Sequence, residues 1–82
     1  MSVIYIKDRN GELTMTNQWS VSKADPDRYG KKAITIAYFH VRLAHHVMIT
    51  YPITMDDFRN LIINAHYDNM PFIDLREIER AA

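Results

Sequence analysis

The stretch VIYIKDRNGELTMT, residues 3–16, decides the fold class. Residues 3–7 are rich in β-branched and aromatic side chains, which strands favour, and residues 13–16 alternate as a strand does. Between them stands Asn10-Gly11, the strongest short signal for a hairpin, because both residues tolerate the positive φ angles of a type I′ turn. A two-residue turn at this point sets Ile6 opposite Met15. We therefore predict an antiparallel hairpin with one apolar face.

Residues 33–53 have the composition of strands, but fully extended they would span roughly 70 Å, too far for so small a domain. We favour a hairpin that turns near 42–45. A three-residue loop at 42–44 would pair Phe39 with Val47 and bury the odd-numbered positions on one face. The alternatives are a single bent or bulged strand and a short helix within the same segment, at 37–46.

The segments on either side of this one differ in character. Residues 20–32 contain Asp-Pro-Asp and a glycine, which favour chain reversals, so they are predicted to form a loop. Thr54 and Asp57 form a capping pattern, and apolar residues recur after them at helical spacing. They predict a helix over 54–68, followed by a short strand at 72–75 and then a helical tail or a strand extension.

The predicted fold class is therefore α+β, with 1–82 as a single domain. An antiparallel sheet of four or five strands packs one face on one main helix, residues 54–68. The predicted core is made of apolar side chains from that sheet and that helix: Ile4, Ile6, Met15, Trp19, Phe39, Val41, Val47, Ile49, Phe58, Leu61, Ile62, Ala65 and Phe72.

Composition narrows the class of protein. Hydrophobic residues make up 48% of the 82 residues and charged residues 24%, an ordinary globular balance. The absence of cysteine excludes disulfides and thiolate zinc sites. Residues 1–42 carry seven Lys and Arg against four Asp and Glu, a net of +3, and residues 43–82 carry three against six, a net of −3. We expect a cytoplasmic protein without a membrane partner, because neither a signal peptide nor an apolar span is evident.

The four histidines are the first candidates for a metal site, and Asp68 or Asp74 would have to complete the ligand set. On one strand, His40 and His46 would share a face, but a zinc site needs three or four ligands, and the remaining histidines, His45 and His66, match no known ligand spacing. No nucleophile elbow, phosphate loop or dinucleotide motif is present. We therefore expect no catalytic residue, no metal and no cofactor.

The favoured function is non-enzymatic protein binding. On the predicted helix, Ile63 and Tyr67 are i,i+4 neighbours, Met70 follows them, and Arg59 and His66 flank them. This set predicts a protein-binding site on a small regulatory or inhibitor protein, of the kind that phages make against host machinery, which occupies a surface of a partner protein. In the competing interpretation, Ile63 and Tyr67 pack against the C-terminal tail or the loop 20–32 and belong to the core. An exposed strand edge within 33–53 would also allow a homodimer.

The alternative function is nucleic-acid binding through the segment 23–32. Its basic and aromatic side chains suit phosphates and bases, although two aspartates in the segment oppose this. The candidate residues are Lys23, Arg28, Tyr29, Lys31 and Lys32. A plain solvated loop would show the same composition.

Overall fold

A computed structural model describes residues 2–82 and confirms the α+β class. The elements in chain order are β1 (Ile4–Lys7), β2 (Leu13–Thr16), β3 (Trp19–Lys23), α1 (Pro26–Tyr29), β4 (Ile34–His40), β5 (His45–Tyr51), α2 (Met55–Ile62), β6 (His66–Tyr67), β7 (Met70–Asp74) and α3 (Leu75–Ala81).

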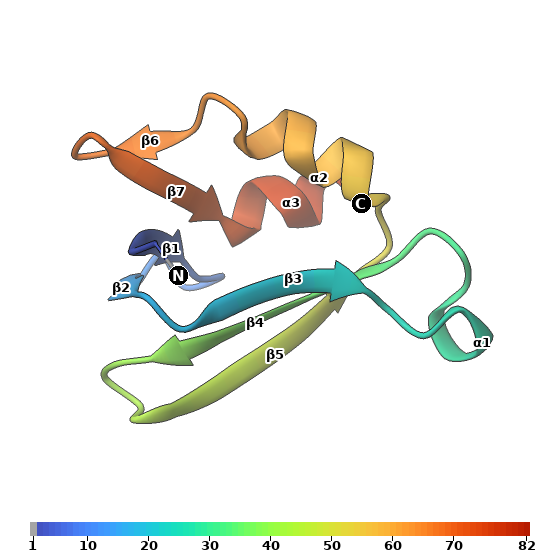
Figure 1. Ribbon diagram of the computed structural model, residues 1–82, viewed down its shortest axis with the longest axis horizontal. Helices are drawn as coiled ribbons and strands as arrows, with labels where there is room; N and C mark the ends of the chain where they lie inside the picture. Colours follow the sequence, from blue (N-terminus) through green and yellow to red (C-terminus); the bar gives the residue numbers. More distant parts are fainter. Residues whose placement is uncertain (1) are drawn as a thin grey trace.

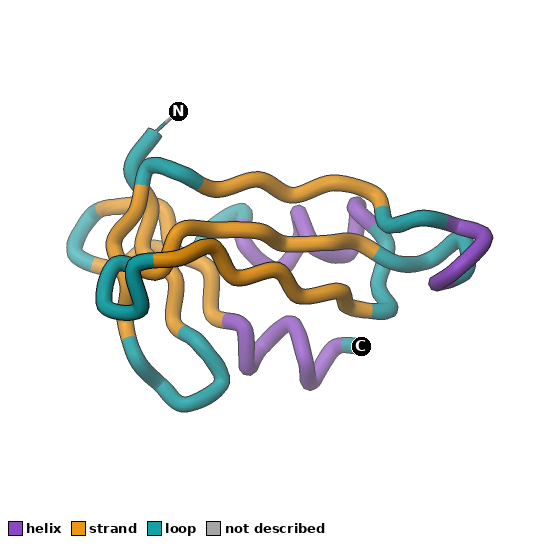
Figure 2. Tube along the Cα trace, turned by 90° about the horizontal axis from the view of Figure 1, so that it is seen from below, coloured by secondary structure: helices purple, strands orange, loops and turns teal. Residues whose placement is uncertain are grey.

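The strands form two sheets instead of the single antiparallel sheet predicted. One has the order β2-β1-β7-β6 and is mixed, because β1 and β7 run parallel; the other is antiparallel, in the order β3-β4-β5. Helices α2 and α3 lie on one side of the three-stranded sheet, and the four-stranded sheet stands at one end of it (Figures 1 and 2). The expectation of one main helix is not met either, since the longest helix, α2, spans eight residues and shares its layer with α3.

The first hairpin lies where it was predicted, but its turn is different. The Asp8 carboxylate accepts hydrogen bonds from the amides of Asn10 and Glu12, both at 2.9 Å. The Gly11 amide donates to the Asp8 carbonyl at 3.0 Å, and Gly11 takes a φ of 84°. These are the features of a type I turn followed by a left-handed residue, and not of a two-residue type I′ turn.

The longer turn shifts the register by one residue. Ile6 pairs with Thr14 instead of Met15, and a shift of one residue exchanges the two faces of a strand. Thr14 and Thr16 are therefore buried, while Met15, predicted to be in the core, is 51% exposed.

The segment 33–53 is a hairpin, as favoured, so the bent strand and the helix are wrong. Its loop has four residues, 41–44, with Ala44 at a φ of 56°, and Tyr38 takes the place opposite Val47 that was predicted for Phe39. An even number of loop residues reverses the parity between the strands. The buried face of β4 is thus the even one, made of Ile34, Ile36, Tyr38 and His40.

Two further boundaries differ from the prediction. Helix α2 begins after Thr54, whose hydroxyl caps the Asp57 amide at 3.1 Å, but it ends at Ile62. Asp68 and Asn69, both at positive φ, form the turn between β6 and β7 instead of a helix end. The predicted loop 20–32 contains most of β3 and the single turn of α1.

The core lies between the sheets and the two longer helices. It contains Ile4, Ile6, Ile34, Ile36, Tyr38, Tyr51, Ile53, Phe58, Ile73, Leu75 and Ile78. Of the residues predicted to be in the core, three are buried: Ile4, Ile6 and Phe58. Four are partly buried and pack against the observed core, namely Trp19, Val47, Ile49 and Ile62, and three are half-buried, namely Phe39, Ala65 and Phe72. The remaining three are exposed: Met15, Val41 and Leu61. The prediction was wrong for the three exposed residues. For Met15 the cause is the one-residue shift of the first hairpin, and for Val41 it is the reversed parity of the second hairpin. The β7–α3 segment supplies three core residues that the prediction missed.

Candidate protein-binding site

The predicted protein-binding residues do not form one helical strip. They lie on different elements: Arg59 on α2, Ile63 directly after α2, His66 and Tyr67 on β6, and Met70 at the start of β7. Because the helix ends before Ile63, the i,i+4 relation between Ile63 and Tyr67 does not exist. Ile63 is 70% exposed.

Tyr67 is held by other aromatic rings. Its ring centroid lies 5.1 Å from that of Tyr5, in an edge-on arrangement, and 5.8 Å from that of Phe72. These contacts tie the β6–β7 turn to β1 across the four-stranded sheet. Tyr67 therefore has a packing role, although part of its side chain stays exposed.

The predicted nucleic-acid-binding residues are all exposed, but only some of them converge. The Arg28 guanidinium lies 5.5 Å from the centre of the Tyr29 ring, next to it on α1. Lys23 and Lys31 line a cavity of about 360 Å³ at the beginning of α2. Arg59 and Asp56 complete the charged lining of that cavity, and Lys32 is not part of it.

A different apolar surface is open on the opposite side of the fold, where β2 approaches β4. We call it the β2–β4 groove. It has a volume of about 340 Å³ and is lined by Val3, Met15, Thr16, Asn17, Gln18, Phe39 and Val41.

The groove forms because two side chains that were predicted to be in the core face outward. The one-residue shift of the first hairpin turns Met15 outward, and the reversed parity of β4 turns Phe39 outward. Met15 is 51% exposed and Val41, at the start of the following loop, is 60% exposed. Apolar side chains of the kind found in protein cores thus lie together on the surface, with polar residues beside them.

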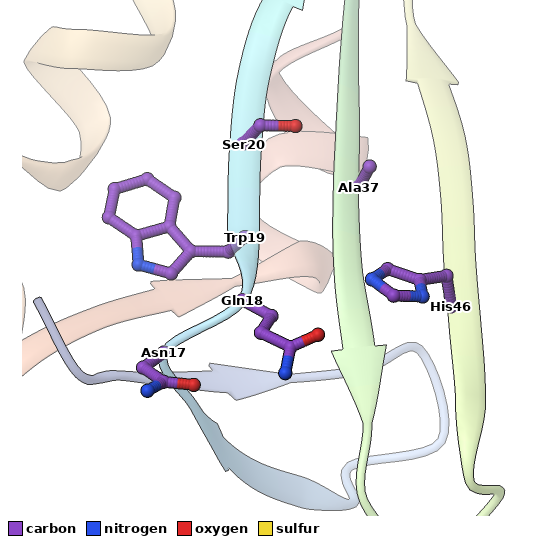
Figure 3. Close-up of a pocket in the computed structure, with 6 residues that line it drawn as sticks. All are labelled: Asn17, Gln18, Trp19, Ser20, Ala37 and His46. Carbon is purple, nitrogen blue, oxygen red and sulfur yellow. The ribbon is translucent and has the colours of Figure 1, made fainter. Parts of the chain in front are cut away.

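Two neighbouring hollows extend the groove. One, of about 380 Å³, shares Met15 and Val41 with the groove and also contains Glu12 and Arg42. The other, also about 380 Å³, crosses β3, β4 and β5 and shares Asn17 and Gln18 with the groove (Figure 3). Small side chains, Ser20 and Ala37, leave this second hollow open, with Trp19 and His46 at its sides. The three hollows form one continuous surface with an apolar middle and polar ends.

One end of this surface is charged. The Arg42 Nε donates to both carboxylate oxygens of Glu12, at 2.8 and 2.7 Å. This hydrogen bonding from Arg42 holds the pKa of Glu12 below its usual value of 4.5, although partial desolvation opposes the shift. Glu12 is therefore an anion at neutral pH and keeps Arg42 in place.

The histidines are not arranged as one strand face would place them. His40 is buried opposite His45, whereas His46 lies on the other face of the sheet, with its ring 5.4 Å from that of Phe39. Instead, His40 meets Asp8 and Glu12, and one donor atom of each lies within 4.8 Å of the others. The prediction missed these two acids. The signal available was their position at the two ends of a tight turn, which places them side by side.

A comparison with protein-family models, with curated proteins and with solved structures finds no match to this chain. None of the helices within residues 2–82 has the length and the apolar composition that crossing a membrane requires. The proposals below therefore depend on the residues alone.

Proposed function

We propose that this protein is a small binding module that covers a surface of another protein and catalyses no reaction. The observation that carries this proposal is the exposure of Met15 and Val41, two large apolar side chains that line the same groove. An apolar centre with a polar rim is typical of protein interfaces. A regulator or inhibitor of this size acts sterically, because the surface that it occupies is no longer open to other molecules.

The groove selects the chemistry of its partner. Met15, Phe39 and Val41 supply apolar walls for one or two large apolar side chains of the partner. Asn17 and Gln18 offer amide donors and acceptors beside them, for polar groups at the edge of the contact. The Glu12–Arg42 pair presents charges of both signs beyond Met15 and Val41, which favours one orientation of a partner with mixed charge.

Affinity capture from the native host with quantitative mass spectrometry tests the proposal. The wild type is compared with the double variant Met15→Ser/Val41→Ser, which removes both apolar anchors. Because both side chains are exposed, the melting temperature should change little. The double variant is expected to lose a partner that the wild type captures.

The control is Ile63→Ser, which removes an apolar side chain outside the groove that is 70% exposed, more than Met15 or Val41. It is expected to capture the same partner as the wild type. Equal capture by the double variant would show that the groove is not the site. Loss of the partner in the control alone would favour the residues predicted from the sequence around Ile63.

Nucleic-acid binding is the second candidate function, and the cavity at the beginning of α2 favours it. Lys23, Lys31 and Arg59 surround one space, which suits a phosphate group, while Asp56 reduces the positive charge. Affinity for a fluorescent single strand should fall steeply with added salt and on Lys31→Glu. A response that does not change with salt would eliminate this candidate.

The homodimer expected from the sequence stays a prediction. Strand β5 is an edge strand of its sheet among the described residues, and its seven residues, His45–Tyr51, include no Lys, Arg, Asp, Glu or Pro. Edge strands of that kind lack the usual protection against strand addition. Sedimentation equilibrium tests the dimer, and a monomeric mass at all concentrations would contradict it.

A further inference from the structure

Three side chains that can bind a metal ion converge between the first hairpin and the end of β4. Asp8 and Glu12 stand at the two ends of the β1–β2 turn, and His40 is the last residue of β4. The His40 Nε2 lies 3.2 Å from the Glu12 Oε2 and 3.8 Å from the Asp8 Oδ2. Residues from both sheets thus meet at one point.

The His40 Nε2 is buried and has no hydrogen-bond partner among residues 2–82. The side chain is only 2% exposed. Although the Glu12 oxygen is near, it does not meet the geometry of a hydrogen bond from the ring nitrogen. A buried polar atom without a partner requires an explanation, and a bound ion is one such explanation.

The separations of the three atoms suit a metal ion. In a tetrahedral site with bonds of about 2.1 Å, neighbouring ligand atoms lie about 3.4 Å apart. The two distances measured from the His40 nitrogen, 3.2 and 3.8 Å, lie on either side of this value. One imidazole with two carboxylates suits Zn²⁺ and related transition ions better than Mg²⁺ or Ca²⁺, which prefer oxygen ligands alone.

The neighbouring groups prepare the site for a cation. The Asp8 Oδ1 is fixed by two backbone amides of its own turn, which orients the other oxygen toward His40. Arg42 is the only Lys or Arg paired with Glu12 among the described residues. The Arg42 side chain is 64% exposed, so it can move aside.

We propose that Asp8, Glu12 and His40 bind one divalent transition-metal ion, with Zn²⁺ as the probe of choice. Three protein ligands leave one position for water. The Leu43 amide donates to the His40 Nδ1 at 3.3 Å, and the Nε2 is the ring nitrogen that lies beside the two carboxylates. The binding of metal here does not depend on the partner protein proposed above.

Isothermal titration of the tag-free chain with Zn²⁺ tests this proposal. One equivalent should bind, and Asp8→Asn and Glu12→Gln should each weaken binding at least tenfold. Asp8→Asn keeps an oxygen acceptor for the turn, so the hairpin should remain folded. Arg42→Gln should tighten binding, because it removes the competing cation. If these residues only stabilised the fold, Arg42→Gln would not tighten Zn²⁺ binding while Asp8→Asn and Glu12→Gln weaken it.

Two further measurements separate this site from other zinc ligands. The variant His45→Gln/His46→Gln/His66→Gln removes the exposed histidines and should bind Zn²⁺ as the wild type does. The amide resonance of Leu43 should shift on titration, which reports on the buried imidazole without a variant that could fail to fold. The proposal is overturned if binding is no tighter than about 1 mM, if it survives Asp8→Asn, or if it disappears in the triple-histidine variant.

Discussion

The substitution Tyr51→Phe should stabilise this protein. The Tyr51 ring is buried, and its hydroxyl has no hydrogen-bond partner within residues 2–82. Leaving a buried polar group unpaired costs about 1–3 kcal/mol, whereas the same hydroxyl is hydrated in the unfolded chain. We expect the lower end, about 1 kcal/mol, because the Arg9 guanidinium lies near the phenol. In a domain of this size that gain corresponds to a rise of about 4–8 °C in melting temperature.

Urea unfolding and thermal melts measure the effect, with Tyr38→Phe as the matched control. The Tyr38 side chain is about as buried as that of Tyr51, but its hydroxyl oxygen is not a fully buried atom without a partner. Its removal should change the free energy of unfolding by less than about 0.5 kcal/mol. A loss of stability of 1 kcal/mol or more in Tyr51→Phe would refute the reasoning, because it would mean that the hydroxyl makes a favourable bond.

The pH dependence gives a second readout of the same group. Burial raises the pKa of Tyr51 above its usual value of 10, partly opposed by Arg9. Because the folded state holds this proton more tightly than the unfolded state, stability falls as the pH rises above 10. The fall should be shallower in Tyr51→Phe than in the wild type, as measured by urea unfolding at several alkaline pH values.

Four further substitutions test the fold. Ile36→Ala should lower the free energy of unfolding by about 2–5 kcal/mol, because Ile36 is fully buried, and Met48→Ala, at a position 74% exposed, should change it by less than about 0.5 kcal/mol; equal losses would mean that β4 and β5 face the other way. Thr54→Ala should cost about 1 kcal/mol in urea unfolding by removing the cap of α2, and an unchanged midpoint would show that the cap is dispensable. Gly11→Ala should cost about 1–2 kcal/mol because of its φ of 84°, unless the hairpin adopts another turn, which a chemical-shift map of residues 4–16 would reveal.

The positions of several elements could be predicted because they depend on neighbouring residues. The strand around Ile4 and Ile6 and the turn at Asn10-Gly11 lie where their local signals indicate. Helix α2 begins where Thr54 and Asp57 place its cap. These features are set within a few residues of the chain.

Which face of each strand is buried could not be predicted as well, because one residue more or less in a loop exchanges the two faces. In β4 a signal was nevertheless present. Ile34, Ile36 and Tyr38 are bulkier than the alternating Thr35 and Ala37, and the larger set is the buried one. A buried histidine at the end of the strand obscures this pattern, because histidine suggests an exposed face.

The end of α2 is set by the hairpin that follows it. Asp68 and Asn69 suit both a helix end and a hairpin turn, and the pairing of β6 with β7 decides between them. The candidate sites were missed because they depend on contacts between distant parts of the chain. The groove forms only where two strands turn particular faces outward, and the cluster of Asp8, Glu12 and His40 forms only where two sheets approach each other.

The parallel pairing of β1 with β7 has a consequence for the order in which this protein is assembled. Tyr5 has its partner at Phe72, so β1, an inner strand of the mixed sheet, cannot pair with β7 until a much later segment of the chain has been synthesised. Each hairpin can close early by itself, but joining them requires a long-range closure that is slow for a chain of this size. Until then Ile4 and Ile6 remain exposed to solvent, and the nascent chain has to be protected from aggregation.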